Sequence, residues 1–142
     1  MQKVLLPFDG SESAKRATQY LLDAARAITG LEVHVLNVQP AMTPYGEYSS
    51  QAMLARMRED ALKHGADVNA HALQLLSAGG VRCSGHESVG DVIAEIGKAV
   101  TASGCDTIVM GTRGMGNLSN LMLGSVATRV VHEVHVPVLL VK

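Results

Sequence analysis

Val4-Leu5-Leu6-Pro7-Phe8-Asp9-Gly10-Ser11, close to the start of the chain, is an apolar run that ends in a turn sequence. Because its apolar residues are continuous rather than alternating, the run predicts a strand buried on both faces, as in a parallel sheet. Ser11 or Ser13 can cap a helix that follows at once. The chain is therefore predicted to begin with a buried strand and then a helix.

The alternation of strand and helix continues to the end of the chain. The first helix takes its apolar face from Ala14, Ala17, Leu21, Ala24 and Ile28 and stops at Gly30. After it we predict a strand at 31–38, a loop at 40–49, a helix at about 49–77, a strand at 81–87 interrupted by Gly85, a helix with Val92, Ile93, Ile96 and Val100 on one side, a strand at 106–110, a helix at about 119–134 and a strand at 136–141. The long helix is predicted to use Leu62, Ala66, Ala70, Leu73 and Leu76 as one face.

Strict alternation of five strands with four helices predicts an α/β fold with a doubly wound parallel sheet, because right-handed crossovers place helices on both faces. Ligands of such sheets bind outside the carboxyl ends of the strands, where the strand order reverses. If the first and fourth strands flank that point, Asp9 and the glycines after residue 110 face each other across one crevice.

Length and composition limit the classes of protein to consider. A chain of 142 residues is long enough for one core, so we expect a single domain over residues 1–142. With 47% hydrophobic and 18% charged residues, the chain is not intrinsically disordered. A net charge of -1 and 3% aromatic residues argue against a nucleic-acid-binding protein, which would need clustered cations or stacking rings.

The sequence carries no signal for a membrane, a secretory pathway or a directly bound metal. The apolar run before Asp9 is too short for a signal peptide, and no apolar stretch reaches the roughly 18 residues of a membrane span. Cys83 and Cys105 are too few for a disulfide framework and lack metal-ligand spacing, and His132 and His135 have no companion ligands. We therefore expect a reduced, cytoplasmic protein.

Glycine is concentrated in one segment, Gly111-Thr112-Arg113-Gly114-Met115-Gly116-Asn117-Leu118-Ser119-Asn120-Leu121-Met122-Leu123-Gly124-Ser125. Backbone N–H groups in such a loop, beside a helix N-terminus, form an anion site suited to phosphates. The same glycines also suit a tight connection between strand and helix, with close packing at Gly124. Loop chemistry alone leaves both interpretations open.

Three well-known phosphate-binding patterns do not fit this segment. A P-loop needs Lys next to Ser or Thr after the glycines, and no such pair is present. The dinucleotide fingerprint GxGxxG is half met by Gly114 and Gly116, because Ser119 occupies its third glycine position. A phospho-acceptor receiver domain would need an acidic pair after the first strand, where Asp9 stands alone.

The spacing Gly111, two residues, Gly114, nine residues, Gly124-Ser125 resembles the nucleotide-binding signature of the universal stress protein family. The opening run described above and the closing run Val136-Pro137-Val138-Leu139-Leu140-Val141 are similar to that family's first and last strands. The resemblance covers essentially the whole chain except the loop at 40–49. It implies a five-stranded sheet of order 3-2-1-4-5, similar to that of the adenine nucleotide alpha hydrolases, and it places the chain in the UspA-like subclass that binds ATP.

The resemblance also implies a role for ten residues. Pro7 and Val38 would lie near the adenine; Asp9 would contact the ribose or help to hold a magnesium ion; Met110, Gly111 and Gly114 would line the path of sugar and phosphate; Gly124, Ser125 and Val126 would hold phosphate oxygens; and Arg113 would pair with a phosphate or remain solvated. Asp9 has a structural alternative as a turn residue beside Gly10.

No set of nucleophile, base and orienting residue is recognisable in the sequence. The favoured function is therefore an ATP-binding stress-response regulator that acts as a binding module with little or no catalysis. The alternatives are a slow ATPase or nucleotide-transferring enzyme on the same fold, and a structural dimer that has lost nucleotide binding. A homodimer is expected because the apolar run at 136–141 would otherwise leave an exposed sheet edge, a mode of pairing that the family resemblance also implies.

Overall fold

Strands and helices alternate along the chain as the sequence predicts. The computed structural model describes residues 1–42, 50–115 and 123–142. Its elements are β1 (Lys3–Pro7), α1 (Glu12–Ala24), β2 (Glu32–Gln39), α2 (Gln51–Ala78), β3 (Arg82–Val89), α3 (Val92–Ser103), β4 (Thr107–Gly111), α4 (Ser125–Glu133) and β5 (Val138–Val141). The predicted loop at 40–49 and the glycine Gly116 fall largely or wholly outside the described residues.

The five strands form one parallel sheet in the order β3-β2-β1-β4-β5. This confirms the predicted fold class and strand order. The chain moves outward from β1 to β3 and then crosses back to β4 on the other side of β1. The strand order therefore reverses between β1 and β4, which is where ligands of such sheets bind.

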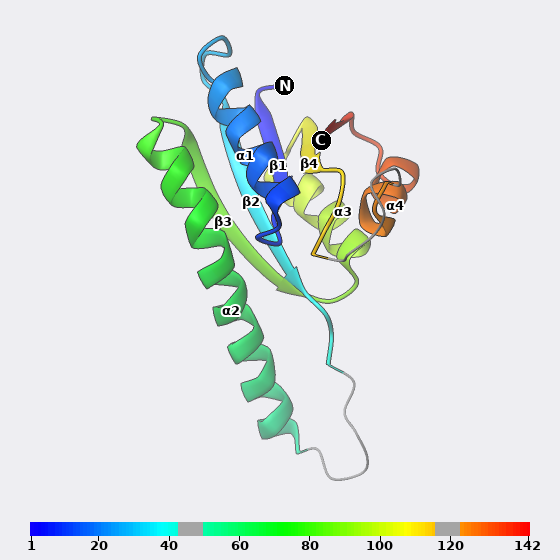
Figure 1. Cartoon of the computed structure of the whole chain (residues 1–142). Coiled ribbons are helices and arrows are strands. Elements are labelled where there is room, and N and C mark those ends of the chain that lie inside the picture. Colours follow the sequence, from blue (N-terminus) through cyan, green and yellow to red (C-terminus); the bar gives the residue numbers. More distant parts are fainter. Residues whose placement is uncertain (43–49, 116–122) are drawn as a thin grey trace.

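Helices cover both faces of the sheet, and each face has its own apolar core (Figure 1). Alternate residues of β1 divide between them, because successive side chains of a strand point to opposite faces. Val4 and Leu6 pack on the face of α1 and α2, whereas Leu5 packs on the face of α3 and α4. Both faces of β1 are thus buried, as its continuous apolar sequence predicts.

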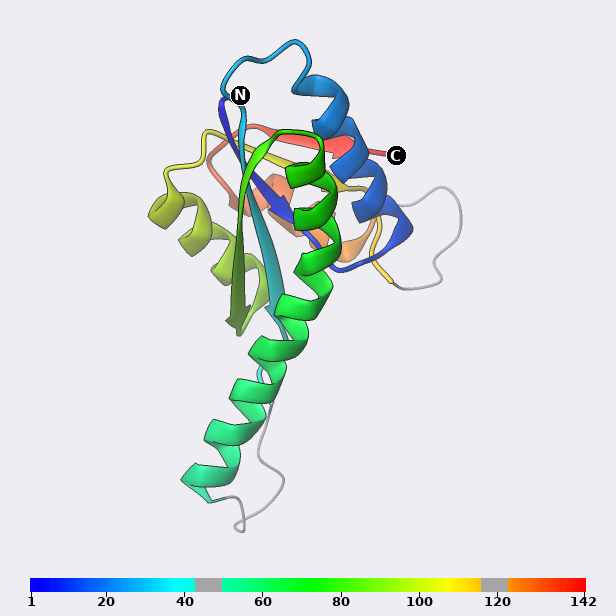
Figure 2. The same ribbon diagram turned by 90° about the vertical axis from the view of Figure 1, so that its left-hand side faces the viewer.

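The buried face of α2 differs from the predicted one. The structure buries Gly65, Asn69, Ala72 and Leu76, whereas Ala66 and Ala70, which the apolar pattern selected, are exposed. Leu73 and Leu76 of the predicted face do pack in or against the core, so the prediction was wrong at Ala66 and Ala70. It missed Gly65 and Asn69 because a small and a polar residue carry no apolar signal. The first half of α2 extends beyond the strands (Figures 1 and 2), and its residues are mostly exposed.

The last helix begins later than predicted. Residues 119–122 lie outside the described residues, and Leu123 and Gly124 are not helical. Gly124 is the N-cap of α4, with an extended backbone (φ -62°, ψ 153°), and its N–H donates to the Thr112 carbonyl at 2.8 Å. Gly124 therefore starts the helix instead of lying inside it.

Two further predicted boundaries were wrong. β3 is not interrupted at Gly85, which pairs in register with Val35. A Cβ at Gly85 would come within 2.8 Å of Leu73 Cδ1, so glycine allows α2 to pack closely on β3. The first helix ends at Ala24, and Ile28 packs against the core from the following turn.

Candidate functional site

A cavity of about 370 Å³ opens at the carboxyl ends of the central strands, beside the N-terminus of α4. All ten residues to which the resemblance assigned a role line it: Pro7, Asp9, Val38, Met110, Gly111, Arg113, Gly114, Gly124, Ser125 and Val126. They come from β1, β2, β4 and α4 and from the turns after β1 and β4. The fold thus brings together residues up to 119 positions apart, from Pro7 to Val126.

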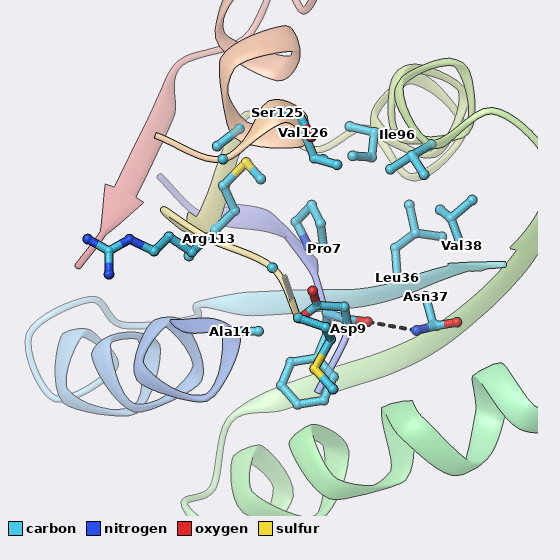
Figure 3. A pocket seen from close by; sticks show the side chains of 18 residues that line it. Pro7, Asp9, Ala14, Leu36, Asn37, Val38, Ile96, Arg113, Ser125 and Val126 are labelled. Carbon is cyan, nitrogen blue, oxygen red and sulfur yellow. Dashed lines mark hydrogen bonds between the residues drawn. The ribbon is translucent and has the colours of Figure 1, made fainter. Parts of the chain in front are cut away.

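One end of the cavity is apolar. Leu36 and Val38 of β2 face Ile96 of α3 and Val126 of α4 across it, and Pro7 lies between (Figure 3). Leu36 and Ile96 belong to the core on the α3 and α4 face and are almost completely buried. This end is therefore a wall of rigid, packed side chains on regular elements, suited to a flat apolar group.

The other end of the cavity is made of backbone at Gly114 and Gly124. A Cβ at Gly114 would lie 3.0 Å from Asp9 Oδ2, so glycine lets the turn after β4 approach the turn after β1. A Cβ at Gly124 would lie 3.2 Å from the Thr112 carbonyl and 3.3 Å from Arg113 Cα. The two glycines thus expose backbone at this end of the cavity.

Gly111, at the end of β4, has a mainly structural role. A Cβ there would collide with Ser13 Oγ and lie 2.6 Å from the Ser13 backbone carbon. The absence of a side chain therefore lets the first turn of α1 pack on the end of β4. Gly111 fixes the distance between two walls of the cavity.

The N-terminus of α4 differs from those of the other helices. Ser11, Ser50 and Asp91 each cap their helix by accepting a hydrogen bond from a backbone N–H of its first turn. The N-cap of α4 is Gly124, which has no side chain to accept one. The first N–H groups of a helix have no partner within the helix and carry a partial positive charge, so this end of α4 favours an anion.

Asp9 serves the turn after β1 and also faces the glycine end. Its Oδ1 accepts a hydrogen bond from the Ser11 N–H at 2.9 Å, which is the turn role that the sequence left open. Its other oxygen, Oδ2, lies toward Gly114. The carboxylate is exposed, so it remains accessible to a hydroxyl-bearing ligand.

The turn after β4 is tied to α1 through the backbone of Arg113. The Arg113 N–H donates to Ser13 Oγ at 3.3 Å, and Ser11 Oγ donates to the Arg113 carbonyl at 3.4 Å. The Arg113 side chain points away from Leu36 and Val38 (Figure 3). Arg113 thus lies at the glycine end, and its guanidinium lies on the side away from the apolar end.

The sequence did not identify several residues of the site. Leu36 and Ile96 were predicted only as members of a strand and a helix, since a buried apolar residue at the end of a strand has the same signature as any core residue. Asn37 was missed entirely. It is 4% exposed, and its Nδ2 donates to the Phe8 carbonyl at 2.8 Å (Figure 3). An amide between the apolar residues Leu36 and Val38 was the one available signal.

The structure also pairs two histidines that the sequence gave no reason to connect. His34 Nδ1 and His86 Nε2 are 2.8 Å apart, and the rings stack with centroids 5.1 Å apart. His34 Nε2 hydrogen-bonds Glu32 Oε1 at 2.9 Å. Burial and the neighbouring His34 lower the pKa of His86. Neither histidine lines the cavity.

Metal and thiol chemistry find little support in the described part of the chain. No group of three or more His, Cys, Asp or Glu residues there could hold a metal ion. Both cysteines are free, and burial raises the pKa of Cys83 and raises that of Cys105 to about 11. Thiols with raised pKa values stay protonated and are poor nucleophiles.

The whole chain, residues 1–142, matches the family model described as the universal stress protein family. The chain belongs to the universal stress protein family. A universal stress protein of Thermus aquaticus is 36% identical over 98% of this chain and 97% of its own length. Another, from Methanocaldococcus jannaschii, is 28% identical over 99% of this chain and 82% of its own length.

Solved structures of this family have the same fold. The hypothetical protein MJ0577 superposes with a TM-score of 0.85 at 28% identity, covering 99% of this chain and 95% of its own. A family protein of Arabidopsis thaliana with AMP bound gives a TM-score of 0.70 at 23% identity, covering 100% of this chain and 92% of its own. Other universal stress proteins with this fold have been solved in complex with cAMP and with dAMP. Among the described residues, no helix is both long and apolar enough to cross a membrane.

Proposed function

We propose that this protein binds an adenine nucleotide in the cavity between β1, β2, β4 and α4 and acts as a regulatory binding module. The observation that carries the proposal is that a single cavity joins an apolar slot to a helix N-terminus whose cap residue, Gly124, has no side chain. A nucleotide combines a flat base with an anionic phosphate, so it matches both ends of the cavity at once.

The geometry supports one orientation of the nucleotide. The base would lie between Pro7, Val38 and Ile96 at the apolar end. The phosphates would lie at Gly114, Gly124 and the first turn of α4, where Ser125 adds a hydroxyl donor. Asp9, beside Gly114, would accept hydrogen bonds from ribose hydroxyls.

We propose ATP as the physiological ligand and a regulatory role in the cytoplasm. The chain's glycine spacing, which resembles that of the ATP-binding UspA-like subclass, supports ATP. Adenine nucleotides in solved relatives support the base. A magnesium ion would be held largely by the phosphates, because Asp9 is the only carboxylate among the described residues that line the cavity. A single carboxylate without a partner base also favours binding over hydrolysis.

Isothermal calorimetry with ATP, AMP, cAMP and GTP, each with and without magnesium, tests this proposal. We expect ATP and AMP to bind and to raise the melting temperature, with GTP much weaker. If no adenine nucleotide binds or stabilises the protein, the proposed function is wrong. Release of inorganic phosphate over hours, measured in parallel, tests the slow ATPase alternative.

We further propose that two copies of the chain pair through β5. β5 is the last strand of the sheet and pairs with β4 on one side. The Pro137 and Val141 carbonyls accept from Ile108 and Thr112, so the backbone groups of Leu140 point toward the opposite edge, which pairs with no other strand among the described residues. The unpaired N–H and C=O groups of an apolar edge strand can pair with a strand of another chain.

Light scattering on a matched pair of variants tests the dimer. Leu140→Pro removes the outward N–H and the side chain, whereas Leu140→Ala removes only most of the side chain. We expect the wild type and Leu140→Ala to be dimers at micromolar concentration and Leu140→Pro to be a monomer. A monomeric wild type, or a dimeric Leu140→Pro, would contradict pairing through this edge.

A further inference from the structure

Asn37 interrupts the hydrogen-bond ladder between β1 and β2 at the edge of the cavity. β1 ends at Pro7, and the Phe8 N–H still donates to the Leu36 carbonyl at 2.8 Å. In a regular parallel ladder the next bond would run from the Val38 N–H to the Phe8 carbonyl. In this structure the Asn37 side chain supplies the donor to that carbonyl instead, at 2.8 Å.

The interrupted ladder leaves backbone groups of Val38 without a partner on β1. Leu36 and Val38 lie two residues apart on β2, so their N–H and C=O groups point to the same side, toward β1. Asn37, and not Val38, donates to the Phe8 carbonyl, so the peptide edge of Val38 is left out of the ladder beside the apolar end of the cavity, which Val38 lines. The Val38 N–H and C=O present a donor and an acceptor side by side.

The Asn37 side chain lies on the face of the sheet that α1 and α2 cover. Val35, two residues before it, packs on the face of α1 and α2, while Leu36 packs on the opposite face. The Asn37 Oδ1 accepts from Gln39 Nε2 at 2.7 Å, and a Cβ at Gly65 of α2 would lie 2.9 Å from it. Both polar ends of the Asn37 amide are thus engaged within the protein, and α2 fits closely around it.

We propose that Asn37 is a positioning residue that holds the ladder open at Phe8 and so leaves the Val38 peptide edge available to read the base. The inference rests on the proposed function of the cavity. An adjacent donor and acceptor match the edge of adenine, which offers a ring-nitrogen acceptor beside an amino donor. Hypoxanthine, with a carbonyl beside a ring N–H, presents the reverse pattern and is disfavoured.

The test compares AMP with IMP, which differ at that edge of the base and carry the same ribose and phosphate. The wild type is expected to prefer AMP. In Asn37→Ala the Phe8 carbonyl loses its donor, and the Val38 N–H can take its place. We expect AMP affinity to fall about tenfold while IMP affinity stays almost unchanged, which removes the preference.

A second variant, on α2, disturbs the position of the Asn37 side chain while Asn37 itself is kept. Gly65→Ala places a methyl group against Asn37 Oδ1 and should reduce the AMP preference in the same direction, by a smaller factor. Gly97→Ala on α3 is the matched control, because a Cβ there meets nothing within 4 Å. It should bind both nucleotides as the wild type does. Gly65→Ala also keeps the test decisive if Asn37→Ala does not fold.

The outcomes separate the two proposals. If the wild type binds no adenine nucleotide, the proposed function fails. If the wild type prefers AMP and both Asn37→Ala and Gly65→Ala keep the same ratio of AMP to IMP affinity, the positioning role of Asn37 fails and the proposed function stands. An equal loss of AMP and IMP affinity in both variants would also overturn the positioning role of Asn37, because that result is expected of general structural damage.

Discussion

The two ends of the cavity are built in different ways. The apolar end consists of side chains on regular elements, such as Leu36 of β2 and Ile96 of α3, and these side chains are also part of the protein core. The glycine end consists of backbone, at Gly114 and Gly124 and at the first turn of α4. A change at the apolar end should therefore alter stability as well as binding, whereas a change at Gly114 or Ser125 of the glycine end should alter mainly binding.

The largest effect is expected from Ile96→Ala at the apolar end. Ile96 is fully buried, so its truncation should lower the free energy of unfolding by about 3 kcal/mol. Chemical denaturation measures this loss. Val131→Ala on α4, where the side chain is 45% exposed, is the control and should change stability by less than about 0.5 kcal/mol. Equal stability of the two variants would show that the apolar end is not part of the core.

Gly114→Val should have the next largest effect, and it should appear in binding. The backbone at Gly114 is not among the positive-φ glycines, so a side chain is conformationally tolerated. Its Cβ would lie 3.0 Å from Asp9 Oδ2 and would occupy the space assigned to phosphate. We expect AMP affinity to fall about a hundredfold, equivalent to ~2.7 kcal/mol, with little change in melting temperature. A loss of folding instead of binding would remove the contrast between the two ends.

This difference in construction explains how much of the site was predictable. Glycines can be counted and spaced in a sequence, and the spacing of Gly111, Gly114 and Gly124 resembles that of a known family, so these three residues could be selected in advance. Leu36 and Ile96 could not, because burial in a core and burial beside a ligand select the same residue types. The alternation of elements predicted a parallel sheet, and the family resemblance supplied its strand order. Neither predicted the buried face of α2, since Gly65 and Asn69 carry no apolar signal.

Ser125→Ala tests the glycine end with a smaller change. Ser125 is the first residue of α4, and its hydroxyl is one donor among several backbone N–H groups. Its loss should cost about 1 kcal/mol of binding free energy for AMP, a roughly fivefold weakening. Adenosine, which lacks the phosphate, is the internal control and should bind Ser125→Ala as it binds the wild type. An equal loss for both ligands would mean that Ser125 does not act on the phosphate.

The smallest effect is expected on lowering the pH. It should reduce the stability of the protein at β2, which carries Leu36 and Val38 of the apolar end, and at its neighbour β3. His34 and His86 join β2 to β3 two residues before Leu36. Burial and the neighbouring His34 lower the folded-state pKa of His86 below 6.5, while the nearby Glu87 acts in the opposite direction. Below pH 6.5 the unfolded chain therefore binds more protons than the folded one, so stability is present above that pH and is lost as the pH falls through the folded pKa.

Thermal unfolding of the wild type and of His86→Gln between about pH 7.5 and pH 5.5 measures this effect, because the ordinary histidine pKa of about 6.5 falls in that range. Glu32 stays ionised throughout, since the hydrogen bond from His34 lowers its pKa from 4.5. The wild type should lose more stability than the variant over this range, because glutamine does not take up a proton. Parallel curves for the two proteins would show that His86 does not make the stability of this part of the sheet depend on pH.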